Sequence, residues 1–356
     1  MKKIFISSTG VRSGQSLAAW CVGEMLHSQG LRIGFFKPFV TRPVSHNNQI
    51  IDKDALLMKE YFNLPEDLNL ICPVFPEEVP NDEVAREEQL MRIEECYEKV
   101  QREKDVLIIM GSEKIFYEQD SPYLPDGILV NKFNAPVLLI DKFQNENMSM
   151  YSVLAIDSFL NDMVKFVFVN QIPLESMESA YNKLVPFFQK RGSPIIFLVP
   201  QDRILTSFTV RNIVDIIQGE VLTGENRLEN LVESTSISSS HLQGSLYLFR
   251  RIYNKIILLG LDADTLNGPL VAPRVTGILL TGGRKPAPLI VNTCGDLGIP
   301  LAVSPFDTFV TMEKIQKQQT HIIHKDVFKL KRFMQLLGGD AATQKIVAQL
   351  DEVYKF

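Results

Sequence analysis

The first forty residues alternate between apolar runs and a segment with helical periodicity. Residues 4–6 form an apolar run suited to a buried strand, and residues 7–16 are small, polar and glycine-bearing. Residues 17–28 carry apolar side chains at helical spacing and end just before a glycine, as helices often do. A second apolar run follows at 31–36. The pattern predicts a strand–loop–helix–strand unit with its loop at the helix N-terminus.

The same alternation continues through the first two hundred residues. Near-continuous apolar runs alternate with amphipathic segments, as expected for strands that are buried on both faces of a parallel sheet. The expected strands are 105–111, 135–141, 166–169 and 195–200, and the expected helices are 54–62, 82–104, 153–160, 184–190 and 209–217. This order predicts an α/β fold in which helices cover both faces of a parallel sheet.

The composition changes after residue 217. Residues 226–240 are polar and serine-rich, and a second strand–helix alternation then begins. Its expected helices are 241–253, 289–297 and 308–317, and its expected strands are 255–260, 275–280 and 301–304. An amphipathic tail at 325–356 is interrupted at Gly338-Gly339. We therefore predict a sheet domain at 1–217, a smaller α/β domain at 218–322 and a helical tail at 323–356, which docks on this chain or on a partner.

Composition narrows the class of protein. The 356 residues are 45% hydrophobic, which is ample for packed cores, and a net charge of −5 argues against a nucleic-acid-binding protein. No apolar run has the ~18 residues that a membrane span needs, and the run after the N-terminal lysines is too short for a signal peptide. The four cysteines lack paired spacing and fit reduced thiols. We expect a cytoplasmic protein that does not bind membranes.

The loop at residues 7–16 carries the main chemical signal. A helix N-terminus favours a phosphate, because free N–H groups and the helix dipole point at it. A working phosphate loop ends in Gly-Lys-Ser or Gly-Lys-Thr, whose lysine reaches the β/γ-phosphates and whose hydroxyl holds Mg²⁺. Here the sequence is Gly14-Gln15-Ser16, so that positive charge is missing. The alternative reading is a plain glycine turn before a helix.

Three charged residues, Asp54, Glu113 and Arg12, each allow two interpretations of their role. Asp54 is either a helix cap or first-turn acid, or a carboxylate directed at a metal. The strand that ends at Met110 lacks the acid that a Mg²⁺ site needs there, and Glu113 is either a substitute or a surface acid. Arg12 either donates to phosphates from within the loop or is simply solvated.

The ordered set of motifs resembles the dethiobiotin-synthetase-like P-loop family, in the form found as the N-terminal part of long phosphotransacetylases. The matches are the loop at 8–16, FFKP at 35–38, DKDALLM at 52–58, the apolar strand before Gly111, and VNQIP at 169–173. The most specific is VPQDRILTSFTVRNI at 199–213, which resembles that subfamily's Pro-(Glu/Gln)-Asp-Arg-x-Leu…Thr-Val-Arg stretch. Together the matches cover roughly residues 1–220 and imply a P-loop sheet domain.

The resemblance implies a role for each matching residue. Ser16 and Asp54 would lie on the Mg²⁺ side, and Lys37 would lie in the acceptor pocket. Asn170 would hydrogen-bond the nucleotide base, and ATP or another adenine nucleotide would contact the loop through Arg12, Gly14 and Gln15. Without the family pattern, Lys37 reads as an exposed strand end and Asn170 as a turn residue.

Two charged residues of the family's site are replaced in this chain. Gln15 stands where the P-loop lysine is usual, and Met110 stands where the strand-end glutamate is usual. Removing one preorganised charge typically costs ~10²–10³ in rate. Efficient ATP-dependent ligation is therefore not expected, and the two losses also put Mg²⁺ binding in doubt.

The second half resembles the small domain named after its Asp-Arg-Thr-Gly-Gly sequence. Residues 275–315 match its second half, whereas Gly260 to Asp264 stands where Gly-Asp-Arg is usual. The resemblance implies a regulatory, dimer-forming unit, with Thr281-Gly282-Gly283 as candidate contacts for a regulatory ligand. The alternative for these three residues is a tight turn between a strand and a helix. His321 and His324 lack partners at metal spacing and are expected to form a surface pair.

These features lead to one expected function and two alternatives. We expect a regulatory or scaffold protein, linked to acetyl- or acyl-phosphate metabolism, in which a degenerate nucleotide site precedes a ligand-sensing, dimerising domain. The first alternative is a divergent ATP-dependent ligase or carboxylase of the dethiobiotin synthetase or cobyrinic acid a,c-diamide synthase type. The second is an accessory subunit for a phosphotransacetylase-type partner, because the matched segments do not include that catalytic domain. In each case we expect a nucleotide or small-molecule effector and a homodimer.

Overall fold

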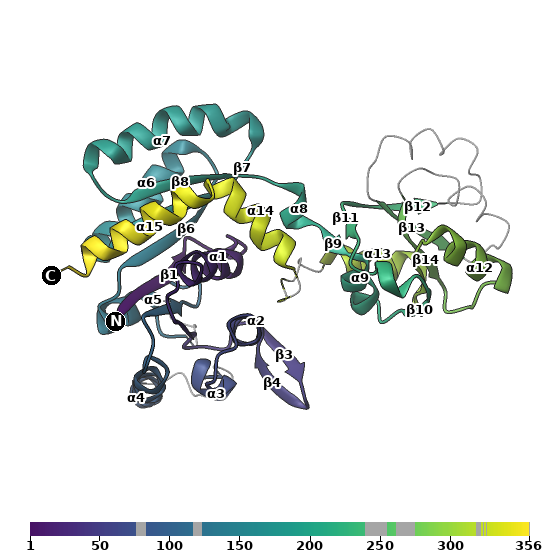
Figure 1. The fold of residues 1–356 in the computed structure, drawn as a ribbon, viewed down its shortest axis with the longest axis horizontal. Coiled ribbons are helices and arrows are strands. Elements are labelled where there is room, and N and C mark those ends of the chain that lie inside the picture. Colours follow the sequence, from purple (N-terminus) through teal and green to yellow (C-terminus); the bar gives the residue numbers. More distant parts are fainter. Residues whose placement is uncertain are drawn as a thin grey trace. The chain divides into compact units, whose positions relative to one another are not determined.

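The computed structural model describes residues 1–75, 83–116, 123–238, 255–260, 275–317, 322, 324 and 326–355. Contacts divide the chain into two compact units (Figure 1). The first consists of Met1–Gln201 together with Ile322–Phe356, and the second of Asp202–His321. The helix expected at 241–253, the departure at 261–264 and His321 of the expected histidine pair lie outside the described residues, while His324 contacts Glu60.

The first unit is built on a six-stranded parallel sheet. The strand order is β2-β5-β1-β6-β7-β8, and every neighbouring pair is parallel. The strands are β1 (Lys2–Ser8), β2 (Ile33–Phe36), β5 (Val106–Met110), β6 (Val137–Lys142), β7 (Val164–Ile172) and β8 (Ile195–Pro200). The central strands are buried on both faces, which explains their near-continuous apolar runs. The predicted fold class, a P-loop parallel sheet followed by a smaller α/β domain, is confirmed.

Helices cover both faces of this sheet, and alternate residues of a strand serve different faces. One core joins the sheet to α4 (Glu83–Val100), α5 (Asp126–Phe133), α6 (Glu146–Phe159) and α7 (Met177–Arg191). Val167 and Val169 of β7 belong to that core. Phe168, between them, instead meets Phe333 of α14 (Val327–Leu337), with ring centroids 6.2 Å apart.

The C-terminal tail is an integral part of the first unit. Both α14 and α15 (Asp340–Val353) contact α1 (Gln15–His27), and the predicted interruption at Gly338-Gly339 is confirmed between them. The hydroxyl of Tyr354 donates to the Lys3 carbonyl at 3.1 Å, and Lys2 pairs with Asp351. The tail thus docks on its own chain, against α1 and β8 of the first unit (Figure 1).

The boundary after Gln201 lies earlier in the chain than the predicted boundary after residue 217. The reason is α9 (Val210–Ile216), whose Val210, Ile213 and Val214 are buried in the core of the second unit. In addition, β9 (Phe208–Thr209) pairs with β11 (Leu231–Val232). The polar, serine-rich stretch is therefore internal to the second unit and does not mark its beginning.

The second unit contains a five-stranded sheet in the order β10-β15-β14-β13-β12. Its strands are β10 (Glu220–Thr223), β12 (Ser234–Ser238), β13 (Lys255–Gly260), β14 (Val275–Thr281) and β15 (Leu301–Val303), of which β10 is an antiparallel edge. One core includes α9 and α13 (Thr308–Lys317), and α12 (Pro288–Leu297) contributes Cys294 to another. Each core contains strand residues, so helices pack on both faces.

Several elements of the first unit were not predicted, among them the short helix α3 (Leu68–Ile71). Residues expected to form polar loops instead make a hairpin of β3 (Pro43–His46) and β4 (Gln49–Asp52), whose turn residues Asn47 and Asn48 both have positive φ. Helix α5 was also missed.

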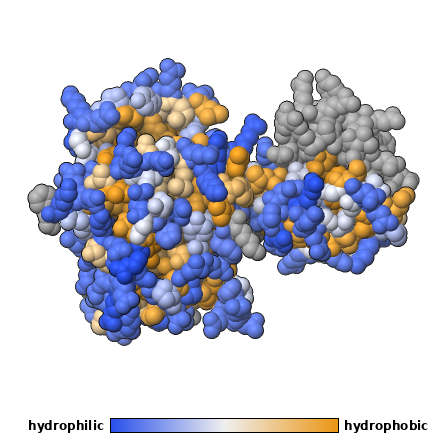
Figure 2. Space-filling view, in the orientation of Figure 1, coloured by the Kyte–Doolittle hydropathy of each residue, from blue (hydrophilic) through white to orange (hydrophobic). Residues whose placement is uncertain are grey.

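Most of the visible surface of this unit is hydrophilic in Figure 2. No helix in the described part of the chain is long and apolar enough to cross a membrane.

Phe333→Ala tests whether the tail stabilises the first unit. Phe333 is fully buried, so truncation should lower the free energy of unfolding by ~3–5 kcal/mol. The measurement is urea unfolding followed by fluorescence of Trp20, the single tryptophan of the chain, which lies buried on α1. Leu289→Ala, at an exposed position of α12, is the control and should change the midpoint little. An unchanged midpoint for Phe333→Ala would contradict the integral role of the tail.

Candidate nucleotide-binding site

The predicted phosphate loop joins the carboxyl end of β1 to the N-terminus of α1. Gly14 caps the helix in a left-handed conformation, with φ of +96°. A β-carbon at this position would lie only 2.5 Å from the Asn170 amide nitrogen, so close approach and backbone conformation both require glycine. The Ser13 hydroxyl is buried in the loop and has no hydrogen-bond partner among the described residues. An unpaired buried hydroxyl beside free helix N–H groups fits a phosphate ligand.

Gln15 points into the sheet rather than along the loop. Its side chain is fully buried, and Nε2 donates to the Ile6 carbonyl at 2.8 Å and to the Gly111 carbonyl at 3.3 Å. These two carbonyls belong to the ends of β1 and β5. Gln15 thus ties the start of α1 to two central strands, at the position where a P-loop lysine would reach phosphates.

The end of β7 holds the loop from its other side. Asn170 donates from Nδ2 to the Ser13 carbonyl at 2.7 Å, and Gln171 donates from Nε2 to the Arg12 carbonyl at 2.8 Å. Arg12 and Gln171 both have positive φ, an uncommon conformation outside glycine that concentrates at functional sites. Asn170 therefore positions the loop, while the Arg12 side chain is exposed to solvent.

Lys37 is a buried ion-pair centre and not an exposed strand end. Its side chain is 1% exposed, and Nζ lies 2.9 Å from Asp52 and 2.7 Å from Asp54. Burial alone would lower the pKa of Lys37, but the two carboxylates outweigh it and hold that pKa above its ordinary value. Burial alone would raise the pKa of Asp54, and Lys37 and Arg42 instead lower it to about 2. Asp52 also caps α2 (Lys53–Phe62) by accepting from the N–H groups of Asp54 and Ala55.

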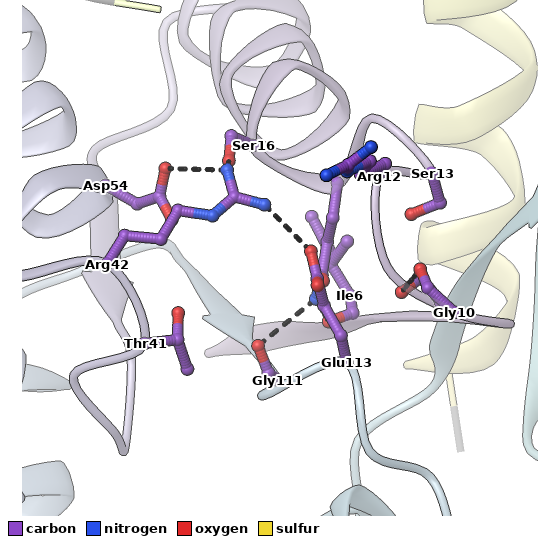
Figure 3. A network of polar contacts seen from close by, with 12 residues as sticks. Ile6, Gly10, Arg12, Ser13, Ser16, Thr41, Arg42, Asp54, Gly111 and Glu113 are labelled. Carbon is purple, nitrogen blue, oxygen red and sulfur yellow. Dashed lines mark hydrogen bonds and ion pairs between the residues drawn. The ribbon is translucent and has the colours of Figure 1, made fainter. Parts of the chain in front are cut away.

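Arg42, which the sequence motifs did not single out, joins the predicted metal-side residues. Nη1 donates to the Ser16 hydroxyl at 2.6 Å and lies 4.0 Å from an Asp54 oxygen. Nη2 donates to Glu113 at 2.9 Å (Figure 3). Burial raises the pKa of Glu113, an effect that the Arg42 charge opposes. The guanidinium thus lies among the oxygens that a metal ion on this side would need.

These oxygens do not fit Mg²⁺ as they are arranged. Mg²⁺ is bound by hard oxygen ligands, usually one or two carboxylates together with substrate phosphates. The Ser16 hydroxyl is engaged by Arg42, and Asp54 is held by Lys37. Within the described ranges, no group of three or more His, Cys, Asp or Glu side chains could hold a metal ion. Met110 is buried in β5 and supplies no ligand.

A second buried acid lies at the same edge of the sheet. Asp126, at the start of α5, accepts from the Ser7 hydroxyl at 2.6 Å and from the Ser112 N–H at 2.8 Å. Burial raises the pKa of Asp126 to about 6. A β-carbon on Gly111 would lie 2.1 Å from an Asp126 oxygen, which explains the glycine after β5. No motif pointed to Asp126; the Pro-Asp pair before an apolar segment was the available signal.

In the second unit, Thr281, Gly282 and Gly283 follow β14. The hydroxyls of Thr281 and Thr308 lie 2.7 Å apart. Gly282 and Gly283 have positive φ, and their N–H groups donate to the carbonyls of Phe306 and Ser304. Such contacts are what a tight turn between strand and helix requires. A ligand role for these residues stays a prediction.

Comparison with known proteins places both units. The chain is 24% identical to a phosphate acetyltransferase of Synechocystis over 368 aligned residues, which cover 98% of this chain and 52% of that protein. It is 22% identical to the ATP-dependent dethiobiotin synthetase BioD of Methanocaldococcus jannaschii, over 56% of this chain and 94% of that enzyme. The chain thus spans about half the length of the phosphate acetyltransferases that it matches.

The chain also aligns with a solved structure at low similarity. The CBS and DRTGG domains of the regulatory region of a Clostridium perfringens pyrophosphatase, complexed with diadenosine tetraphosphate, align with 46% of this chain and 85% of that one. The identity is 16% and the TM-score 0.29, which is too low to support a functional comparison.

Family models assign the two units directly. Residues 212–318 match the DRTGG domain. This matched range lies within the second unit and covers most of it. Residues 2–208, more than half of the chain, match the AAA domain. The phosphate-loop unit, its parallel sheet and the similarity to dethiobiotin synthetase agree with that assignment. The chain therefore belongs to the AAA domain family and carries, after that domain, a DRTGG domain.

Proposed function

We propose that this chain is a regulatory protein whose first unit binds an adenine nucleotide without transferring its phosphoryl group. The observation that carries the proposal is the buried Gln15 side chain, which is committed to two backbone carbonyls. The loop keeps the features that bind phosphate: a left-handed Gly14, the helix N-terminus and the unpaired Ser13 hydroxyl. Binding features are thus retained where the catalytic charge is replaced.

The loss of the P-loop charge lowers the expected rate of phosphoryl transfer enough to argue against catalysis. Phosphoryl transfer depends mainly on positioning and on charges directed at the phosphate oxygens. A neutral amide that points into the sheet cannot supply such a charge, and each lost charge costs ~10²–10³ in rate. Met110 replaces a second charged group, so the combined loss leaves little acceleration.

The position of Lys37 argues against the ligase alternative. A lysine that contacts an acceptor substrate must present its ammonium group to a pocket. Lys37 is instead held by Asp52 and Asp54, with 1% of its side chain exposed. Its three N–H donors are matched by nearby carboxylate oxygens, which favours a structural role.

The relatives suggest the process that is regulated. The similarity to a phosphate acetyltransferase extends over 98% of this chain and includes both units. We propose that nucleotide occupancy of the first unit and an effector on the DRTGG domain control an enzyme of acetyl-phosphate metabolism. We further propose that the DRTGG domain forms a homodimer.

The central test measures nucleotide binding and turnover together. Calorimetry with ATP, ADP and AMP should show binding, while released phosphate should stay at the level of a protein-free control, because the catalytic charges are replaced. Ser16→Ala should leave that phosphate background unchanged. Robust Mg²⁺-dependent ATP hydrolysis that Ser16→Ala abolishes would refute the proposal and revive the ligase.

Lys37→Met separates a structural lysine from a substrate-binding one. Removing one partner of a buried ion pair leaves uncompensated carboxylates and should cost ~3–5 kcal/mol of unfolding free energy. The measurement is urea unfolding followed by Trp20 fluorescence. Lys183→Met removes a charge from a largely exposed position and serves as the control. If Lys37→Met unfolded like the wild type, its contacts would not be structural and the acceptor role would return.

A further inference from the structure

Arg42 has a backbone that is held in place and a side chain that is partly exposed. Its backbone N–H donates to Asp52 at 3.1 Å, as does the N–H of Thr41, so the loop between β2 and β3 is fastened to the buried ion pair. The side chain itself is 35% exposed, whereas Lys37 is 1% exposed. Of the cations in this ion-pair cluster, Arg42 is therefore the one that an incoming ligand can reach.

The guanidinium also has donors to spare. It carries five N–H groups, and its contacts in the described part of the chain use one bond from each Nη to Ser16 and Glu113. The remaining N–H groups can donate to phosphate oxygens while the present contacts persist. Arginine suits such an arrangement because its planar fork binds phosphate in a fixed geometry.

The position of Arg42 links it to the phosphate loop. Ser16 is the second residue of α1, so its hydroxyl lies at the helix N-terminus where phosphate oxygens bind. Arg42 Nη1 is 2.6 Å from that hydroxyl. A cation at this place does what a divalent metal does in catalytic relatives of the fold: it neutralises phosphate charge beside the loop.

We infer that Arg42 is a built-in cation that replaces the divalent metal, so that the site takes a nucleoside diphosphate or triphosphate free of Mg²⁺. A nucleotide already complexed with Mg²⁺ would bring a second cation against the guanidinium, and this like-charge contact disfavours the complex. The inference rests on the proposed nucleotide-binding function. It adds the ionic form of the ligand and the residue that selects it.

The test compares nucleotide affinity in EDTA and in Mg²⁺. Calorimetry with ADP and ATP should give the wild type its tighter binding in EDTA. Arg42→Ala should weaken binding in EDTA about tenfold or more, the effect of one charge-assisted contact. Because this change frees the Ser16 hydroxyl and the Glu113 carboxylate, Mg²⁺ should then tighten binding to the variant. Arg32→Ala removes an exposed arginine that pairs with Asp105, and should behave as wild type.

Glu113→Gln makes the test independent of folding defects. This change removes the anion that competes for the guanidinium but keeps the hydrogen-bonding shape, so metal-free binding should tighten several-fold. A purely structural role for Arg42 predicts weaker or unchanged binding instead. Thermal unfolding of each variant shows whether a loss of affinity reflects a loss of fold.

The outcomes separate the inference from the proposed function. If wild-type binding requires Mg²⁺ and Arg42→Ala leaves it unchanged, the Arg42 inference fails while a non-catalytic nucleotide site stands. If inorganic triphosphate binds in EDTA through Arg42 but no nucleotide does, the nucleotide assignment fails and the metal-free cation site stands. If neither probe binds in either buffer, both are overturned.

Discussion

The candidate nucleotide site of the first unit depends on a single buried ammonium group. Lys37, at the end of β2, attracts Asp52 and Asp54 into the protein interior. Asp52 in turn caps α2 and accepts the N–H groups of Thr41 and Arg42. Burying these charges is tolerable only while all of them are paired, because an isolated buried ion costs several kcal/mol. The ion pair therefore fixes the end of a strand, the start of a helix and the loop between them as one body.

The need to pair buried charges also explains why residues of the family's motif contact each other and not a ligand. Lys37 and Asp54 match positions that handle substrate and metal in the family that the sequence resembles, yet here each satisfies the other. Gln15 likewise satisfies the carbonyls at the ends of β1 and β5. Polar groups that are paired with each other are preorganised, but they are no longer directed at a ligand. Retention of a motif in the sequence consequently says less about catalysis than the direction in which its side chains point.

Sequence patterns over short stretches predicted the features that depend on interactions between residues close together in the chain. The parallel strands, the phosphate loop and the interrupted C-terminal helices could be read from apolar runs, glycines and helical periodicity, and the structure confirms them. Two features depend on contacts between distant residues and could not be read. Arg42 contacts Ser16, which lies 26 residues earlier in the chain. Arg42 directly precedes a hairpin that the sequence did not reveal. The tail returns to β8 and α1 only after the whole second unit, so its burial partner was not predictable from its own periodicity.

In the proposed site, Arg42 supplies the positive charge that Gln15 lacks, and it does so from another element. A P-loop lysine belongs to the rigid start of a helix, whereas Arg42 lies on a loop and shares its guanidinium with Glu113. Phosphate oxygens bound to the remaining N–H groups would share the guanidinium charge with Glu113, whose carboxylate is largely buried. Burial already raises the pKa of Glu113, so a weakened partner favours its protonation or a move of the segment after β5. Ser112 belongs to that segment and donates its N–H to Asp126 at the start of α5. In the proposed regulatory site, the charge of a ligand would thus act on the segment after β5 as well as on the phosphate loop.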